Sequence, residues 1–266
     1  MQKEVKGSAL ITGASSGIGL ELARLFAKDG IHLVLVARST DKLQRLAGEL
    51  ENAHSIRAIV LPSDLAIPGA PDELFSRTQA ESIPIDFLVN NAGFGLRESF
   101  ERNDLKQILE MLQVNVVALT HLTKLYLKDM LARRNGKILN VASTAAYQPG
   151  PWMAVYYATK AYVLSLSEAL SNELSGTGVT VSALCPGPTW TGFQERAGAK
   201  DMKLMKSGMM AVMDAATVAK KGYDGMMKNK RVIIPGLMNR IVATAARIGP
   251  RDWSTAIAGA MNKSKS

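Results

Sequence analysis

The sequence has few residues that could bind a metal or cross-link the chain. Cys185 is the only cysteine among 266 residues, so an internal disulfide is excluded, and one thiol cannot build a zinc site. Because Cys185 ends an apolar segment, we expect a buried structural thiol and not a reactive one. The three histidines, His32, His54 and His121, are far apart and lack the spacing of metal ligands. We therefore expect no metal site.

Long apolar runs are also absent. No stretch of 18 consecutive apolar residues occurs, so no membrane-spanning helix is expected. The first seven residues lack the apolar core of a secretory signal. No repeat, low-complexity tract or Pro/Gly/Ser-rich linker interrupts the chain. We expect a cytoplasmic protein with one domain over residues 1–236, extended by residues 237–266.

Net charge is low except near the C-terminus. Residues 200–266 contain thirteen Lys/Arg and four Asp/Glu, a net of +9, while the rest of the chain has nineteen of each sign and balances to zero. A basic region can bind nucleic acid, but aromatic residues are not interleaved with these charges. We expect no nucleic-acid partner.

Short apolar segments alternate with helical patterns along the chain. The apolar segments predict strands at 8–12, 32–37, 56–61, 85–90, 136–142, 178–185 and 231–235. Such alternation is typical of a parallel sheet covered by helices on both faces. A chain of this length can bury an ample core as one α/β domain.

A glycine-rich turn follows the first apolar segment. It runs from Thr12 and Gly13 to Gly19 with the sequence TGASSGIG, and apolar residues then recur at helical spacing up to Gly30. A strand, a glycine-rich turn and a helix N-terminus form a cradle for a pyrophosphate, because unpaired N–H groups and the helix dipole attract an anion. An ordinary strand-to-helix loop is the alternative.

Tyr156 and Lys160 stand one helical turn apart, and Ser143 lies thirteen residues before the tyrosine at a separate predicted strand. A nearby cation can lower the pKa of a phenol so that it donates a proton at neutral pH. A fall from about 10 to near 7 requires about 4 kcal/mol. The pair alone is a weak motif, because both residue types are common. Tyr157 and Tyr162 have no lysine four residues later, so we expect them to be packing residues.

Five motifs occur together along the chain. They are TGxxxGIG at 12–19, Asn90-Asn91-Ala92-Gly93 after a strand, Asn115, Ser143 with Tyr156 and Lys160, and Pro186-Gly187. In order and spacing this set resembles the short-chain dehydrogenase/reductase family, in its short, single-domain, NADP(H)-preferring branch. The resemblance covers roughly residues 5 to 235. It implies a doubly wound parallel sheet (Rossmann fold) of about seven strands in the order 3-2-1-4-5-6-7, with the ligand crevice at the carboxyl ends of the strands.

The resemblance also implies an activity: transfer of a hydride between a nicotinamide and a carbonyl or secondary alcohol. Tyr156 would be the general acid in carbonyl reduction, and Lys160 would lower its pKa and hold the nicotinamide ribose. Ser143, with Tyr156, would bind and orient the substrate oxygen. Asn115 would hold a water that links the lysine to solvent; a hydrogen-bonded core amide is the alternative.

The end of the second predicted strand bears on the choice of cofactor. An enzyme that prefers NAD usually has a carboxylate there for the ribose 2′-hydroxyl, whereas this chain has Ala37, Arg38 and Ser39. Arginine offers a planar donor fork for a phosphate, and the resemblance also implies NADP(H). A solvated arginine is the alternative. Asp64, followed by Leu65, matches a family position that contacts the adenine amino group; a turn-forming aspartate is the alternative.

Further cofactor contacts are implied by the resemblance. The Asn-Asn-Ala-Gly turn would serve the adenine ribose and strand stability, and the Pro-Gly loop would receive the carboxamide. The full implied set is Gly13, Ser15, Ser16, Gly17, Ile18, Gly19, Arg38, Ser39, Asp64, Leu65, Asn91, Ala92, Gly93, Tyr156, Lys160, Pro186, Gly187, Thr189 and Thr191.

Segment 189–215 occupies the position of the family's substrate lid. It is rich in methionine, including Met202, Met205, Met209 and Met213. Methionine is flexible and polarizable, so this segment favours a hydrophobic ketone or aldehyde, 3-oxoacyl- or sterol-like. The same residues also fit one face of an amphipathic helix that packs on the body, which is the alternative.

Residues 237–261 predict a basic amphipathic helix. It could contact an anionic membrane surface, cover the substrate opening, form a subunit contact, or simply be solvated. The resemblance implies a homodimer or homotetramer through helices around 104–132 and 154–175. The alternative function is a non-catalytic NADP(H)-binding redox sensor or scaffold on the same fold. A sensor has no need to keep a proton donor, so the intact catalytic set favours an enzyme.

Overall fold

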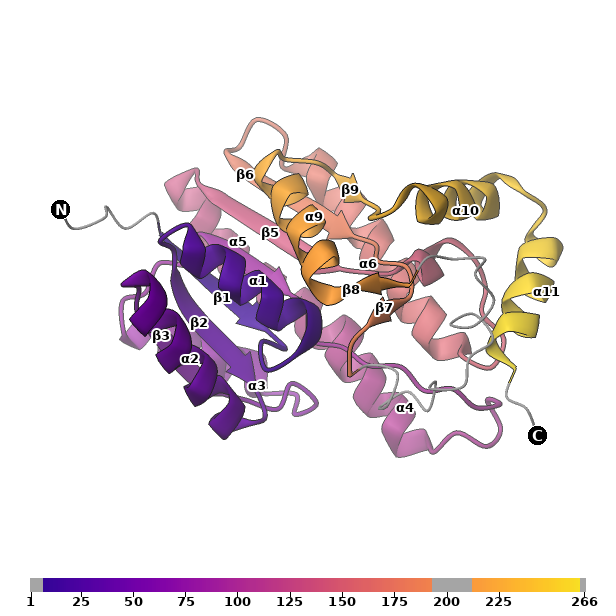
Figure 1. Cartoon of the computed structure of the whole chain (residues 1–266), viewed down its shortest axis with the longest axis horizontal. Coiled ribbons are helices and arrows are strands. Elements are labelled where there is room, and N and C mark those ends of the chain that lie inside the picture. Colours follow the sequence, from indigo (N-terminus) through magenta and orange to yellow (C-terminus); the bar gives the residue numbers. More distant parts are fainter. Residues whose placement is uncertain (1–6, 193–211, 264–266) are drawn as a thin grey trace.

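A seven-stranded parallel sheet forms the centre of the molecule (Figure 1). The computed structural model describes residues 7–192 and 212–263, and the strand order is β3-β2-β1-β4-β5-β6-β9. The strands are β1 (Ser8–Thr12), β2 (His32–Ala37), β3 (Ala58–Pro62), β4 (Phe87–Asn90), β5 (Gly136–Val141), β6 (Val179–Leu184) and β9 (Val232–Ile233). The predicted single-domain, doubly wound sheet is confirmed.

Several strand boundaries differ from the prediction because pairing sets them, not the length of the apolar run. β3 and β4 each begin two residues later than predicted, where Ala58 pairs with Leu33 and Phe87 pairs with Ala9. The last strand was predicted at 231–235, but β9 has only two residues. It lies at the sheet edge and pairs with β6 alone.

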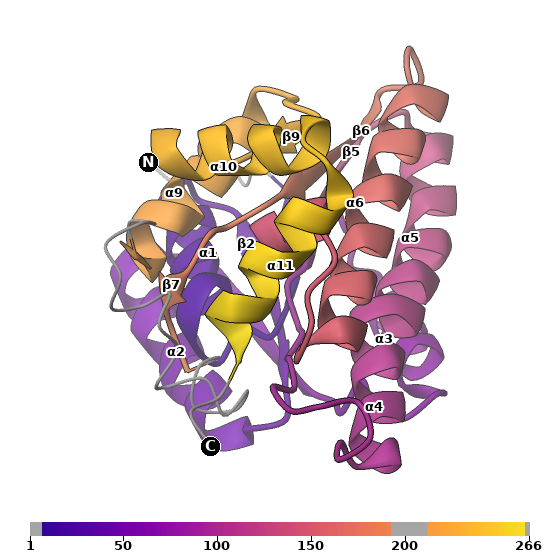
Figure 2. The same cartoon turned by 90° about the vertical axis from the view of Figure 1, so that its right-hand side faces the viewer.

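Helices cover both faces of the sheet, as Figure 2 shows edge-on. One layer consists of α1 (Gly17–Lys28), α2 (Thr40–His54) and α9 (Ala215–Met227). The other consists of α3 (Ala70–Ala80), α4 (Leu105–Leu112), the π-helical turn η1 (Gln113–Ala118), α5 (Leu119–Arg133) and α6 (Ala154–Glu173). Successive strand side chains point to opposite faces. Ile11 and Leu35 therefore pack in the first layer, and Leu10 and Val34 in the second.

A small second sheet was not predicted. β7 (Thr189–Trp190) pairs in parallel with β8 (Met213–Asp214), so the two ends of the predicted substrate lid meet. Most of that lid, residues 193–211 with the methionines at 202, 205 and 209, falls outside the described residues. The prediction of a methionine-lined lid therefore stays a prediction.

The single helix predicted over 237–261 is wrong, because the structure has two. α10 (Leu237–Ile248) and α11 (Arg251–Asn262) are separated by Gly249 and Pro250. Proline lacks an N–H group and disfavours helical geometry in the residue before it, and Gly249 has an extended ψ of 164°. The two helices lie together at the right-hand end of the molecule in Figure 1. We call α10 and α11 the C-terminal arm.

Candidate active site

A large cavity of about 1110 Å³ opens at the carboxyl ends of the central strands. Every residue of the implied cofactor set lines it except Gly19, and Ser143 lines it too. Asn115 does not line the cavity; it lies behind the residues that do. Residues that are spread over nearly 180 positions of the sequence, from Gly13 to Thr191, therefore surround one space.

The glycine-rich turn packs too tightly for side chains at its first and last glycines. Gly13 has a φ of +67°, and a Cβ atom there would lie 2.8 Å from Asn91 Nδ2. A Cβ atom at Gly19 would lie 2.4 Å from the carbonyl oxygen of Gly13. α1 starts in this turn, and its N-cap, Ser16, makes no side-chain capping hydrogen bond. The N-terminal N–H groups of α1 thus lack a side-chain acceptor, an arrangement that fits a phosphate.

Several hydrogen bonds hold this turn against the end of β4. Asn91 Nδ2 donates to the carbonyl oxygen of Thr12 at 2.9 Å. Thr12 Oγ1 accepts from the backbone N–H groups of Asn91 and Ala92, both at 3.0 Å. The Asn-Asn-Ala-Gly turn therefore stabilises the strand ends, as the resemblance implies. Its contact with an adenine ribose stays a prediction.

Two cations line the cavity beyond the end of β2. Arg38 lies 4.0 Å from Asp64 in an ion pair that is half exposed and hence weak. Asp64 also accepts a hydrogen bond from Ala66 N at 3.1 Å, so it forms a turn as well as lining the cavity. Lys42, in the first turn of α2, also lines the cavity, and the sequence analysis did not predict it. The available signal was a second basic residue in the first turn of the helix that follows Arg38.

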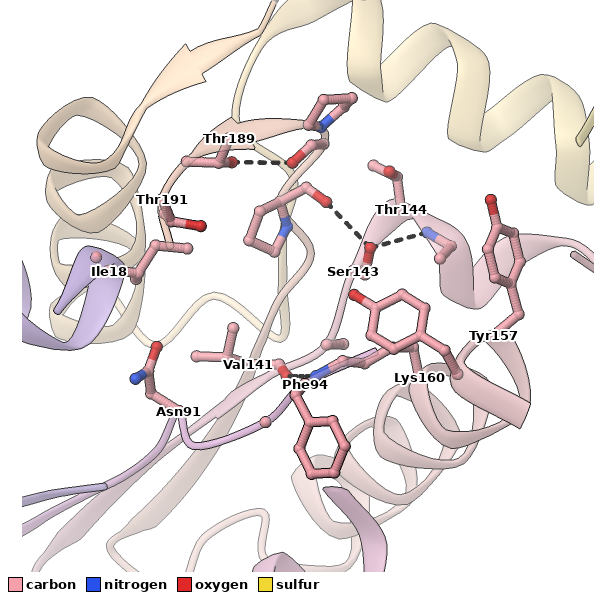
Figure 3. Close-up of a pocket in the computed structure, with 18 of the residues that line it drawn as sticks. Ile18, Asn91, Phe94, Val141, Ser143, Thr144, Tyr157, Lys160, Thr189 and Thr191 are labelled. Atoms are coloured by element: carbon pink, nitrogen blue, oxygen red, sulfur yellow. Dashed lines mark hydrogen bonds between the residues drawn. The ribbon is translucent and has the colours of Figure 1, made fainter. Parts of the chain in front are cut away.

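Ser143 links three parts of the site. Its Oγ accepts from Ala145 N at 3.1 Å and donates to the carbonyl oxygen of Pro186 at 3.4 Å (Figure 3). It also makes a side-chain hydrogen bond with Tyr156, which lowers the pKa of that phenol. β5 and the turn that follows it therefore place a hydroxyl beside the expected general acid, as the spacing predicted.

Lys160 is buried below Tyr156. Its Nζ donates to the carbonyl oxygen of Val141 at 2.8 Å, the bond drawn in Figure 3, and lies 5.8 Å from the centre of the Tyr156 ring. Burial lowers the pKa of Lys160 from 10.5 to about 8. The ammonium thus contacts a backbone carbonyl at the end of β5 and lies under the aromatic ring.

The predicted fall in the pKa of Tyr156 is not what the protein's own groups produce. Burial raises the pKa of this phenol well above 10, and the hydrogen bond from Ser143 offsets only part of the rise. The buried phenol therefore keeps its proton firmly.

Asn115 is a satisfied buried amide, which was the alternative considered for it. Its Nδ2 donates to the carbonyl oxygen of Phe94 at 2.9 Å and to Thr159 Oγ1 at 3.1 Å. Its Oδ1 accepts from Phe94 N at 3.1 Å. Asn115 thus braces the chain after β4 against α6. The water-holding role implied by the resemblance stays a prediction.

The loop after β6 joins the catalytic residues to the C-terminal arm. The carbonyl oxygen of Pro186 accepts from Thr144 N at 2.8 Å, and Thr189 Oγ1 donates to the carbonyl oxygen of Gly187 at 2.9 Å. A Cβ atom at Gly187 would lie 2.5 Å from Nδ2 of Asn239, a buried residue of α10. The position of α10 is therefore tied to this loop.

The far side of the cavity is an apolar wall. α10 and α11 supply most of it, so that the C-terminal residues lie at the opening, one of the roles left open for them. The arm residues with large apolar side chains in the wall are Met238, Ile241, Val242, Trp253, Ile257 and Met261. Phe94, Met153 and Tyr157 line the cavity from the body of the protein.

The end of α11 is held by a buried asparagine. Asn262 is fully buried, and its Nδ2 donates to the carbonyl oxygen of Pro151 at 3.1 Å and to Tyr157 OH at 3.2 Å. Arg97 Nε donates to the carbonyl oxygen of Asn262 at 2.6 Å. Tyr157, which we expected only to pack, also lines the cavity. No local pattern marks Asn262, because its partners lie more than 100 residues away.

Among the described residues, no three His, Cys, Asp or Glu side chains are grouped to hold a metal, and no helix is long and apolar enough to cross a membrane. Cys185 is buried, and burial raises the pKa of its thiol to about 12.

Comparisons with known proteins agree with this geometry. The sequence profile described as "short chain dehydrogenase" matches residues 7–202. The ketoacyl reductase HetN of Nostoc sp. is 36% identical over 180 residues, which cover 68% of this chain and 62% of HetN. A short-chain dehydrogenase from Sphingobium yanoikuyae, solved in complex with NADPH, is 33% identical with a TM-score of 0.80, over 87% of this chain and 88% of that one.

A second solved structure is the bulky-bulky ketone specific alcohol dehydrogenase from Comamonas testosteroni. It is 31% identical with a TM-score of 0.77, over 88% of each chain. The match to HetN spans less than two thirds of that protein's length.

Proposed function

Because the chain belongs to the short-chain dehydrogenase/reductase family, we propose that it is an NADP(H)-dependent reductase of bulky apolar ketones or aldehydes, or the dehydrogenase of the corresponding alcohols. One observation carries this proposal. The hydroxyl, phenol and ammonium of Ser143, Tyr156 and Lys160 line a single cavity that has a phosphate cradle at one end and an apolar wall at the other.

The cradle and the cations support NADP(H) as the cofactor, which supplies or accepts the hydride. The N-terminus of α1 would hold the pyrophosphate. Arg38 and Lys42 would bind the 2′-phosphate, and Ala37 offers no carboxylate that would repel it. The Sphingobium relative was solved with NADPH.

The hydrogen bond between Ser143 and Tyr156 supports the role of Tyr156 as the general acid, because it places the phenol beside the hydroxyl that would orient the substrate oxygen. The phenol would donate its proton to that oxygen as negative charge develops there. Ser143 donates a second hydrogen bond to the same oxygen and orients it. The phenolate that remains is buried, and the nearby charge of Lys160 stabilises it. The pKa of Lys160, about 8, keeps this lysine mostly charged at neutral pH.

The apolar wall supports a bulky apolar substrate. The arm contributes two isoleucines, two methionines and a tryptophan to it, and such surfaces bind apolar ligands with few polar anchors. The Nostoc relative is a ketoacyl reductase, and the Comamonas neighbour acts on bulky-bulky ketones. A 3-oxoacyl-like substrate agrees with the name of the Nostoc relative, and a bulky sterol-like ketone agrees with that of the Comamonas neighbour.

We also propose a homodimer or homotetramer. Large apolar side chains of α4, η1 and α6 are exposed on one side of the protein: Leu105, Leu109, Val117 and Tyr162. Such a patch is typical of a subunit contact. Light scattering at several concentrations measures the mass, and a monomer at every concentration would contradict this part.

The test compares the wild type with Tyr156→Phe on ketones graded by apolar size, with NADPH and with NADH. We expect the variant to lose about 10³-fold in kcat while its NADPH affinity is unchanged. Tyr162→Phe is the matched control on the same helix, and it should keep its activity. We also expect kcat/KM of the wild type to rise with ketone size.

Two results would contradict the proposal. Full activity in Tyr156→Phe would mean that another group is the acid. Tight NADPH binding without turnover of any carbonyl would favour the redox sensor or scaffold instead.

A further inference from the structure

The C-terminal arm carries an apolar stripe that meets solvent. On α10, Leu237, Ile241, Ala245 and Ile248 recur at intervals of four, four and three residues, which places them on one helical face. All four are exposed, and the exposed fractions of Leu237 and Ile248 are 73% and 80%. The buried residues of α10 lie on another face. The stripe therefore stays open to solvent across two full turns or more.

Arginines flank this stripe. Arg240 and Arg247 each precede an isoleucine of the stripe, so they lie beside it on the helix surface and not behind it. Arg251 begins α11 and is followed by Trp253, whose exposed fraction is 72%. Within the described part of the chain, none of the three arginines forms an ion pair with a carboxylate. The arm thus combines exposed apolar side chains with unpaired positive charge.

The positive charge of the arm indicates which kind of partner could cover the stripe. Residues 237–263 contain three arginines and one lysine against one aspartate. A second copy of the chain would bring the same arginines to the same face in a two-fold contact, and the like charges would repel. A nucleic acid would leave the apolar stripe exposed. An anionic bilayer accepts both features.

We propose that the exposed stripe of α10, which borders the cavity at Ile241 and Ala245, and the start of α11 dock on an anionic lipid membrane. The leucine and isoleucines enter the boundary between headgroups and acyl chains, while the arginines contact lipid phosphates. Trp253 lies at the depth where a ring with an apolar body and a polar N–H is favoured. The arm lies on the membrane and does not span it.

Docking would bring the cavity mouth to the membrane. Four residues of the arm line the cavity and have exposed fractions of about one half or more: Met238, Ile241, Trp253 and Ile257. An apolar carbonyl compound dissolved in the bilayer could then enter without crossing water. This consequence rests on the proposed function, whereas the docking itself does not.

The experiment is co-sedimentation of the full chain with vesicles of phosphatidylcholine alone or mixed with phosphatidylglycerol. We expect binding to the anionic vesicles at low salt, weaker binding at high salt, and little binding to phosphatidylcholine. The double variant Arg240→Gln, Arg247→Gln should lower the partition constant about 30-fold. Leu237→Ser with Ile248→Ser should lower it at least about tenfold.

Matched controls remove the same groups elsewhere on the surface. Arg45→Gln with Arg77→Gln removes two exposed charges on α2 and α3, and Ile67→Ser removes an exposed isoleucine before α3. Both controls should bind like the wild type. Equal losses in the arm variants and the controls would mean that only net charge matters, and would overturn the proposal.

Two further outcomes would also overturn it. One is no binding to anionic vesicles at low salt. The other concerns Ile248→Ser: light scattering would give half the mass of the wild type, and vesicle binding would be unchanged. The stripe would then be a subunit contact. Turnover of a water-soluble ketone, measured in parallel, separates the two proposals. Binding without turnover contradicts only the enzyme, and turnover without binding contradicts only the docking.

Discussion

The two ends of the cavity are built in different ways. The cradle end consists of backbone and short polar side chains in turns that directly follow β1, β2 and β4, and hydrogen bonds such as that from Asn91 to Thr12 hold it. The arm end consists of long apolar side chains from the last 30 residues, and Asn262 and Arg97 fasten its final turn. The difference suggests that cofactor binding and substrate choice can change independently.

The largest effect is expected when the two cations at the cradle end are removed. We expect Arg38→Ala with Lys42→Ala to weaken NADPH binding about 100-fold, because two charge-assisted hydrogen bonds of about 1.5 kcal/mol each are lost. NADH binding should be unchanged. Fluorescence titration with both nucleotides measures this. Arg45→Ala, which removes a charge elsewhere on α2, is the control, and an equal loss for NADH would contradict the assignment.

A smaller effect is expected at the arm end. Asn262→Ala removes the hydrogen bonds to Pro151 and Tyr157 and should cost about 2 kcal/mol of unfolding free energy. We expect KM for a bulky ketone to rise about tenfold, since the arm wall loosens, with NADPH affinity unchanged. Asn52→Ala on the exposed face of α2 is the control. A parallel loss of NADPH affinity would show that the two ends are coupled.

The smallest expected effect concerns Lys160, which lies between the two ends. Its pKa in the folded state is about 8 and lies below the ordinary 10.5, so burying the charged lysine costs stability; the cost is complete below pH 8 and disappears as the pH rises from 8 towards 10.5. From pH 7 to pH 9 the wild type should gain about 1 kcal/mol of unfolding free energy relative to Lys160→Met. Urea unfolding of both proteins at each pH measures the difference. A constant difference would mean that the lysine titrates normally.

The cradle end was largely predictable because its chemistry is local in sequence. The motif glycines, Asn91 and the Tyr156–Lys160 pair each follow a strand or share a helix, so strand order alone brings them together. The spacing also placed Ser143 correctly. Lys42 could have been found by looking for a second cation in the first turn of the helix after Arg38.

The arm end was not predictable to the same degree. The amphipathic pattern indicated a helix but could not show that Pro250 divides it, nor which face turns to the cavity. The bond between Asn262 and Tyr157 joins residues 105 positions apart, and no period in the sequence encodes it. The burial that raises the pKa of Tyr156 in the protein without cofactor could not be predicted either, because burial depends on packing by the whole domain.

All three tryptophans of the chain lie at or beside the cavity. Trp253 lines it, and Trp152 and Trp190 are chain neighbours of the lining residues Met153 and Thr189. Tryptophan emission overlaps the absorption of a reduced nicotinamide, so a bound reduced cofactor should quench it by energy transfer. The protein thus carries its own optical reporter, which needs no label and would also register movement of the arm.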